Sequence, residues 1–112
     1  MRPETLQHLA DAKSAAEELR QVAVAGWQQE RILALAVERL LTIIGEAFVR
    51  MRASEPDVLD QITDAPKIIG MRNVLVHGYD ALDPARIQDA IALSVPKLIT
   101  DIDVLLTGHG RG

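Results

Sequence analysis

The sequence predicts an all-α fold, an up-and-down bundle of four to five helices joined by short loops. Hydrophobic residues make up 48% of the 112 residues but aromatic residues only 3%, so the core must consist mainly of Leu, Ile, Val and Ala. Apolar residues recur at helical spacing, and no stretch alternates as a strand would. This length fits a single domain at residues 1–112, with a flexible tail expected at 108–112.

Two long helices are predicted in the first half of the chain. The first spans residues 4–25 and stops at Gly26. Its apolar positions are Leu6, Leu9, Ala16, Leu19 and Val22. The second spans about residues 28–53. Its apolar stripe is Leu33, Val37, Leu40, Ile44, Ala47, Phe48 and Met51. Trp27, at the junction, is interpreted as a packing anchor rather than as a surface for stacking bases.

Helix boundaries follow where proline meets a capping residue. Ser54 is expected to cap a short helix that has Pro56 in its first turn and runs through Ile62. Pro66 then lies near the start of a fourth helix, which is expected to end where Gly78 takes the left-handed conformation.

The last predicted helix begins after a short loop. Asp83 is its expected N-cap and Pro84 its first residue. Its buried face is formed by Ile87, Ile91, Leu98, Ile102 and Leu105. Pro96 falls inside this pattern, and because proline cannot donate a backbone hydrogen bond, it should kink the helix or split it in two.

Composition and charge exclude several classes of protein. A net charge of −4 without a basic run argues against a broad nucleic-acid-binding face, so a contact with nucleic acid must be local or completed by a partner. The chain has no cysteine, and His8 and His109 lack ligands at suitable spacing, so we expect no metal and no cofactor. The absence of a long uncharged apolar run or a signal-peptide pattern favours a cytoplasmic protein without a membrane segment.

The stretch GMRNVLVHGYD, residues 70–80, places unusual polar groups on an otherwise apolar helix. Arg72 offers donors suited to a phosphate, and Asn73 supplies both a donor and an acceptor. If the helix ends at His77, the negative end of the helix dipole favours the protonated imidazole there, and Tyr79 follows just past the end. Such a set suits cleavage of RNA, whose 2′-hydroxyl supplies the nucleophile without a metal.

A structural explanation of the same residues stays open. His77 could interact only with the last carbonyl groups of the helix, and Tyr79 could anchor a loop. Glu46 on the second helix could pair with Arg72, either to orient it within a site or as an ordinary ion pair of the bundle. Spacing alone does not decide between these alternatives, because Arg72 and His77 would differ by about 140° around an ideal helix.

The motif resembles that of a known family. Arg-x4-His-x-Tyr at residues 72–79 is similar to the signature of HepT-like proteins, the HEPN-domain toxins of HEPN/MNT toxin–antitoxin systems. IIGEA at 43–47 and IIGMRN at 68–73 resemble segments that accompany the motif in that family. The similarity extends over about residues 4–107.

The resemblance implies an activity and its control. Members are HEPN-like bundles that form homodimers in which two motifs face one cleft. By analogy the chain is the toxin of a type VII system, a metal-independent endoribonuclease with Arg72 and His77 catalytic and Asn73 shaping the site. A cognate MNT-type nucleotidyltransferase antitoxin would neutralise it by transferring AMP to Tyr79, which blocks the cleft and repels the RNA substrate.

Two rival hypotheses use the same residues. In the first, the chain is a non-catalytic nucleotide- or partner-binding subunit of a nucleotidyltransferase complex, and the motif serves that partner. In the second, it is a structural helical dimer whose site has decayed. Cleavage of RNA in EDTA, and its loss in His77→Ala, distinguishes the toxin from both.

Overall fold

The computed structural model describes the backbone of residues 1–78 and 82–111, and the side chains of residues 1–78 and 82–108. This part of the chain contains helices and no strand, which confirms the predicted all-α class. The elements in order are α1 (Pro3–Val22), the 3-10 turn η1 (Trp27–Gln29), α2 (Arg31–Ser54), α3 (Pro56–Leu59), α4 (Ala65–His77), α5 (Pro84–Asp89), the π-helix η2 (Ala90–Ser94) and α6 (Val95–Arg111).

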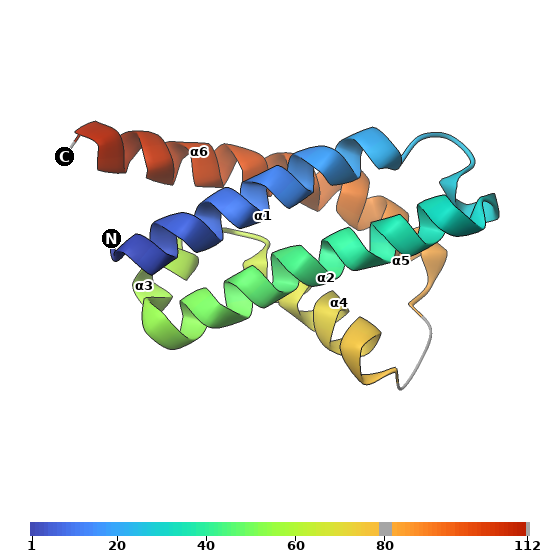
Figure 1. Cartoon of the computed structure of the whole chain (residues 1–112), viewed down its shortest axis with the longest axis horizontal. Coiled ribbons are helices and arrows are strands. Elements are labelled where there is room, and N and C mark those ends of the chain that lie inside the picture. Colours follow the sequence, from blue (N-terminus) through green and yellow to red (C-terminus); the bar gives the residue numbers. More distant parts are fainter. Residues whose placement is uncertain (79–81, 112) are drawn as a thin grey trace.

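The long helices lie side by side in an elongated bundle of 46 × 27 × 19 Å. Figure 1 shows α1 running away from the end that holds both termini, with α2 and α6 returning toward it. α4 packs against α2 on the side away from α6 and runs opposite to α2, so that its last turn lies away from the α1–α6 pair. No helix in the described part of the chain is long and apolar enough to cross a membrane.

The core lies between α1, α2, α4 and α6 and is aliphatic, as the composition predicts. α1 buries small alanines beside its leucines, which lets α2 approach it closely along most of its length. The largest fully buried side chains are Phe48, Leu9, Leu19, Leu41, Ile44, Met51, Ile62, Ile68, Leu98, Ile102, Val37 and Val95. Each such side chain contributes about 1.5–3 kcal/mol through burial, so this layer is the main source of stability.

Two polar contacts fix the ends of the α1–α2 pair. Glu55 Oε1 accepts a hydrogen bond from the backbone N–H of Arg2 at 2.9 Å and another from the hydroxyl of Thr5 at 2.7 Å. These donors lower the pKa of Glu55, the Arg2 N–H having the larger effect. At the other end, the Trp27 indole N–H donates to Gln88 Oε1 at 2.7 Å. The indole is buried, so Trp27 is the packing anchor that the sequence predicts.

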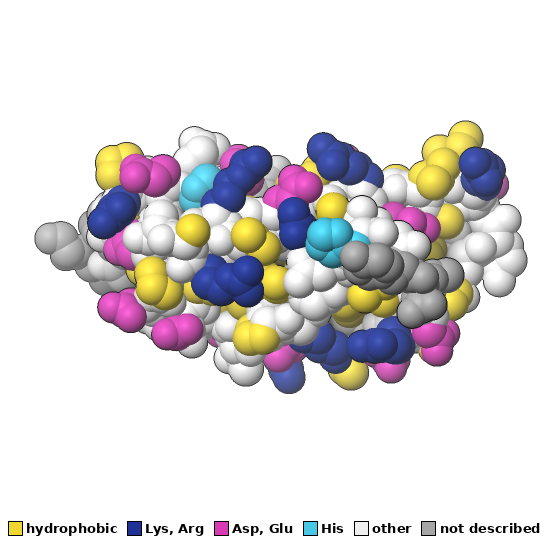
Figure 2. Space-filling model, turned by 90° about the horizontal axis from the view of Figure 1, so that it is seen from below, with side chains coloured by type: hydrophobic (Ala, Val, Ile, Leu, Met, Phe, Trp, Pro, Cys, Tyr) yellow, Lys and Arg dark blue, Asp and Glu magenta, His cyan; other side chains and the backbone are white. Residues whose placement is uncertain are grey.

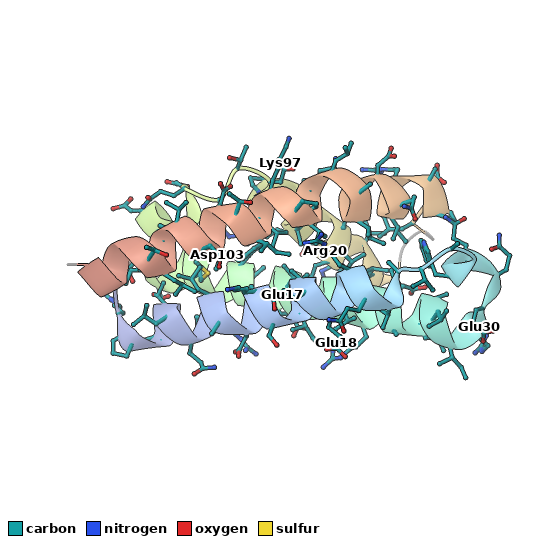
Figure 3. The ribbon with its side chains drawn as sticks, turned by 90° about the horizontal axis from the view of Figure 1, so that it is seen from above. Glu17, Glu18, Arg20, Glu30, Lys97 and Asp103 are labelled. Atoms are coloured by element: carbon teal, nitrogen blue, oxygen red, sulfur yellow. The ribbon has the colours of Figure 1, made fainter. Side chains whose placement is uncertain are left out.

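α6 is joined to its neighbours by two acidic side chains. Lys13 Nζ lies 2.7 Å from Asp103 Oδ1, and this hydrogen bond raises the pKa of Lys13. Figure 3 shows Asp103 on α6 beside α1. Asp101 Oδ2 accepts the backbone N–H of Thr63, in the loop before α4, at 3.0 Å. The first contact holds α6 along α1, and the second holds the start of α4 against α6.

Pro96 divides the last helical segment, as predicted. The five residues before Val95 form the π-helix η2, in which the N–H of Val95 donates to the carbonyl of Ala90. The proline ring would clash with the carbonyl four residues earlier in a regular α-helix, and the wider π turn gives that carbonyl a different position. The start of this segment is also as predicted, since Asp83 accepts the N–H of Ala85 at 2.9 Å and Pro84 follows it.

Several predicted boundaries were wrong. α1 ends at Val22 rather than at residue 25, and Gly26, at φ 85°, belongs to the turn that follows. Ser54 does not cap α3: its hydroxyl donates to the carbonyl of Arg50 at 3.0 Å, which keeps Ser54 in the last turn of α2. α3 ends at Leu59 instead of Ile62. α6 extends through Arg111, and the flexible tail at 108–112 stays a prediction.

Candidate active site

α4 ends as the sequence predicts, and its end places His77. Gly78 adopts the left-handed conformation at φ 64°, and its N–H donates to the carbonyl of Val74 at 2.9 Å. His77 is therefore the last residue of α4, exposed at the C-terminal end of the helix. The last carbonyl groups of the helix at this end carry partial negative charge.

Arg72 lies one and a half turns earlier, where α4 crosses α2. Its side chain is half-buried and passes over Gly45. A Cβ atom built on Gly45 would overlap the Cβ of Arg72 and would lie 2.7 Å from its Cγ. The arginine stem therefore occupies the space that any other residue at position 45 would need for its own side chain.

The guanidinium of Arg72 is only partly satisfied. Its Nη1 donates to Oδ1 of Asn73 at 2.9 Å, whereas its Nε is buried and has no hydrogen-bond partner. A buried donor without a partner costs about 1–3 kcal/mol and is rare in folded proteins. Because Nε is covered, a phosphate can reach only the terminal nitrogens. The hydrogen bond to Asn73 holds one of these nitrogens in place.

Arg72 and His77 leave α4 in different directions. They are five residues apart on the same regular helix, which separates their directions by about 140°. Arg72 packs over Gly45 of α2, and its Nη1 donates to Oδ1 of Asn73. That the long arginine reaches His77 across the last turn therefore stays a prediction.

Glu46 lies on a different side of α2 from Arg72. Within the described residues no ion pair joins the two side chains, and Glu46 instead lines a groove between α1 and α2 together with Asp11, Arg39 and Arg50. The residue that contacts Arg72 is the preceding Gly45, which the sequence analysis did not single out. The available signal was a glycine inside a long and otherwise well-formed helix, where it is unfavourable without a packing reason.

Tyr79, the expected AMP acceptor, lies outside the described residues, as does the side chain of His109. Among residues 1–78 and 82–108, no three His, Asp or Glu side chains are grouped closely enough to hold a metal ion. Figure 2 shows the face seen from below, where Lys and Arg side chains are interspersed with Asp and Glu. A phosphate contact on this face must therefore rest on individual basic side chains and not on a continuous basic patch.

Comparison with known proteins points to one family. The family model described as "Ribonuclease HepT-like" matches residues 7–105. A Methanocaldococcus jannaschii protein named "Putative RNase MJ1380" is 29% identical over 77 residues, which cover 67% of this chain and 68% of that protein. No solved structure matched the chain.

Proposed function

Because this chain belongs to the HepT-like ribonuclease family, we propose that it is the toxin of a toxin–antitoxin pair and an endoribonuclease that needs no metal ion. Membership of this family indicates a nuclease of HEPN type with RNA as its substrate. The observation that carries the finer proposal is the arrangement on α4. Arg72 keeps donors beyond the one given to Asn73, and the helix ends at His77.

The proposed reaction uses the nucleophile that RNA carries. The 2′-oxygen bonds to the adjacent phosphorus, and the bond from phosphorus to the 5′-oxygen of the next nucleotide breaks. One group takes the proton of the 2′-hydroxyl and another gives a proton to the leaving 5′-oxygen, which yields a 2′,3′-cyclic phosphate and a 5′-hydroxyl. His77 performs one of these proton transfers, and the terminal nitrogens of Arg72 stabilise the charge that develops on the phosphate.

The proposed site is completed by a second copy of the chain. Arg72 and His77 are five residues apart on α4, which turns their directions about 140° from each other, so we do not expect a single helix to present both to one phosphate. In a two-fold dimer with the two α4 ends facing one cleft, His77 of one protomer lies near Arg72 of the other. The same pairing would bring two arginines together in a protein of net charge −4.

The proposed control is covalent modification of Tyr79 by a neighbouring nucleotidyltransferase. The tyrosine oxygen bonds to the α-phosphorus of ATP and loses its proton, and pyrophosphate leaves. Tyr79 follows His77 and Gly78 directly in the sequence, so an AMP group there stands beside the end of α4. Its negative charge repels the RNA backbone and its bulk fills the cleft.

An RNA-cleavage assay in EDTA tests the proposal. The unmodified protein should cleave RNA and leave 2′,3′-cyclic phosphate ends, and His77→Ala should lose this activity with an unchanged circular-dichroism spectrum. His8→Ala is the matched control, since His8 lies on α1 in the groove between α1 and α2, and it should retain activity. Intact mass should show addition of AMP, and activity should fall, after co-expression with the cognate nucleotidyltransferase.

Two outcomes would contradict this proposal. If the unmodified protein leaves RNA intact but associates with the nucleotidyltransferase, the chain is a non-catalytic partner of that enzyme. If substitutions at Arg72 or His77 change nothing but stability, these residues are structural.

A further inference from the structure

The crossing of α2 and α4 depends on a glycine. Gly45 is buried in the middle of the 24-residue helix α2. A Cβ at this position would overlap the Cβ of Arg72, would lie 2.7 Å from its Cγ, and would come within 3.4 Å of the backbone carbonyl oxygen of Ile68. The first two atoms lie at the base of the arginine side chain, so they cannot yield as a flexible tip could. The two helices approach this closely only because position 45 has no side chain.

Backbone conformation does not explain the glycine. Among the described residues only Gly26 and Gly78 have positive φ, so Gly45 keeps an ordinary helical conformation that any residue could adopt. Glycine is unfavourable in a helix interior because it has the most backbone freedom to lose. What position 45 gains from glycine is therefore the space that the base of Arg72 fills.

We propose that Gly45 is a positioning residue for Arg72: its bare Cα fixes how closely α4 lies against α2 and thereby where the guanidinium stands. The inference rests on the proposed function in one respect, that Arg72 contacts the phosphate. The pose of Arg72 is the supporting observation. Its Nε stays buried without a hydrogen-bond partner. Packing of the stem on Gly45 therefore holds the guanidinium in this position together with the single hydrogen bond to Asn73.

The chain offers a matched control for the test. Gly70 lies on α4, two residues before Arg72, is exposed, and would have nothing within 4 Å of an added Cβ. Gly45→Ala and Gly70→Ala therefore add the same methyl group inside a helix, in the first case against Arg72 and in the second into open space. Gly70→Ala should fold as well as the parent or better, because alanine is the better helix former. It should leave cleavage and the environment of Arg72 unchanged.

The experiment combines RNA cleavage with a direct view of the arginine. Gly45→Ala should lower the rate at saturating RNA by about ten- to hundredfold, the size expected for a displacement of about 1 Å at a reacting group. It should also shift the Nε–Hε signal of Arg72 in a ¹⁵N-correlated spectrum. That signal is identified by its absence in Arg72→Lys. An unshifted signal with full cleavage overturns the proposal.

Two further results separate positioning from other failures. If the unmodified wild type does not cleave RNA, the proposed function fails, whereas the Nε–Hε shift still decides whether Gly45 positions Arg72. If Gly45→Ala does not fold, the variant that combines it with Arg72→Gly should regain the folded spectrum, because both clashing atoms of the arginine are gone. If this double variant is also unfolded, the stem of Arg72 is not the reason why position 45 must be glycine, and the proposal falls.

Discussion

Replacing Arg72 with methionine separates a functional arginine from a structural one. Methionine is unbranched and fills the space over Gly45 much as the arginine stem does, so the crossing of α2 and α4 should survive. The change removes the charge, the bond to Asn73 and the buried Nε. A residue kept for stability should be costly to replace in this way, whereas a residue kept for function need not be.

Arg72→Met changes two contributions to the free energy of unfolding, and they have opposite signs. Removing a buried donor that has no partner returns about 1–3 kcal/mol. Losing the part-buried bond from Nη1 to Asn73, 2.9 Å long, costs about 0.5–1.5 kcal/mol, and the freed amide of Asn73 can bind water. The net expectation is stabilisation by about 1 kcal/mol, which raises Tm by roughly 3–6 °C in a domain of this size.

Thermal unfolding, monitored by circular dichroism, measures the change in Tm, and an RNA-cleavage assay in EDTA measures the change in activity. Arg72→Met should unfold at a higher temperature than the parent and should have lost cleavage. Arg72→Ala is the comparison variant, because it also deletes the stem and so leaves a gap at the crossing. A clear fall in Tm for Arg72→Met would refute the reasoning, since it would show that the guanidinium stabilises the fold.

Two further predictions concern the contacts that hold the bundle. The pKa of Glu55 is lowered in the folded protein, so the ionised carboxylate contributes to stability at neutral pH, and this contribution is lost as the pH falls below the ordinary value of 4.5. Glu55→Gln should therefore be less stable than the parent at neutral pH and should lose less stability on acidification. Urea unfolding at both pH values measures the difference. Trp27→Phe keeps a ring in the buried site but removes the donor to Gln88, and it should cost about 1–2 kcal/mol in thermal unfolding without changing RNA cleavage.

The sequence predicts well the features that local chemistry decides. Gly78 ends α4 because a left-handed residue is cheap only for glycine, and Asp83 caps α5 because its carboxylate can accept a nearby N–H. Pro96 breaks the last helix because its own ring forbids the regular bond. Ser54 is the exception. Its hydroxyl could either accept a backbone N–H of α3 as an N-cap or donate to a carbonyl of α2, and it donates to the carbonyl of Arg50 in the preceding turn.

The contacts around Arg72 depend on information that spacing does not contain. One step along a helix rotates a side chain by about 100°, so the choice between Glu46 and Gly45 as the neighbour of Arg72 turns on a single residue of register. The apolar stripe of α2 gives the direction of the core but not which of its neighbours, α1 or α4, covers each flank. In the structure, α1 lies along the flank of α2 that carries Glu46, and α4 packs on the flank that carries Gly45.

The same geometry makes the proposed two-chain site testable by mixing inactive variants. If Arg72 of one protomer works with His77 of the other, a dimer of one Arg72→Ala chain and one His77→Ala chain has one site with both residues intact and one with neither. Random pairing makes half of the dimers mixed, so exchange of equal amounts should restore about a quarter of the wild-type cleavage rate. If both residues act from the same chain, every site lacks one of them, and mixing restores nothing. A mixture that stays inactive although mass spectrometry shows mixed dimers would rule out the two-chain site.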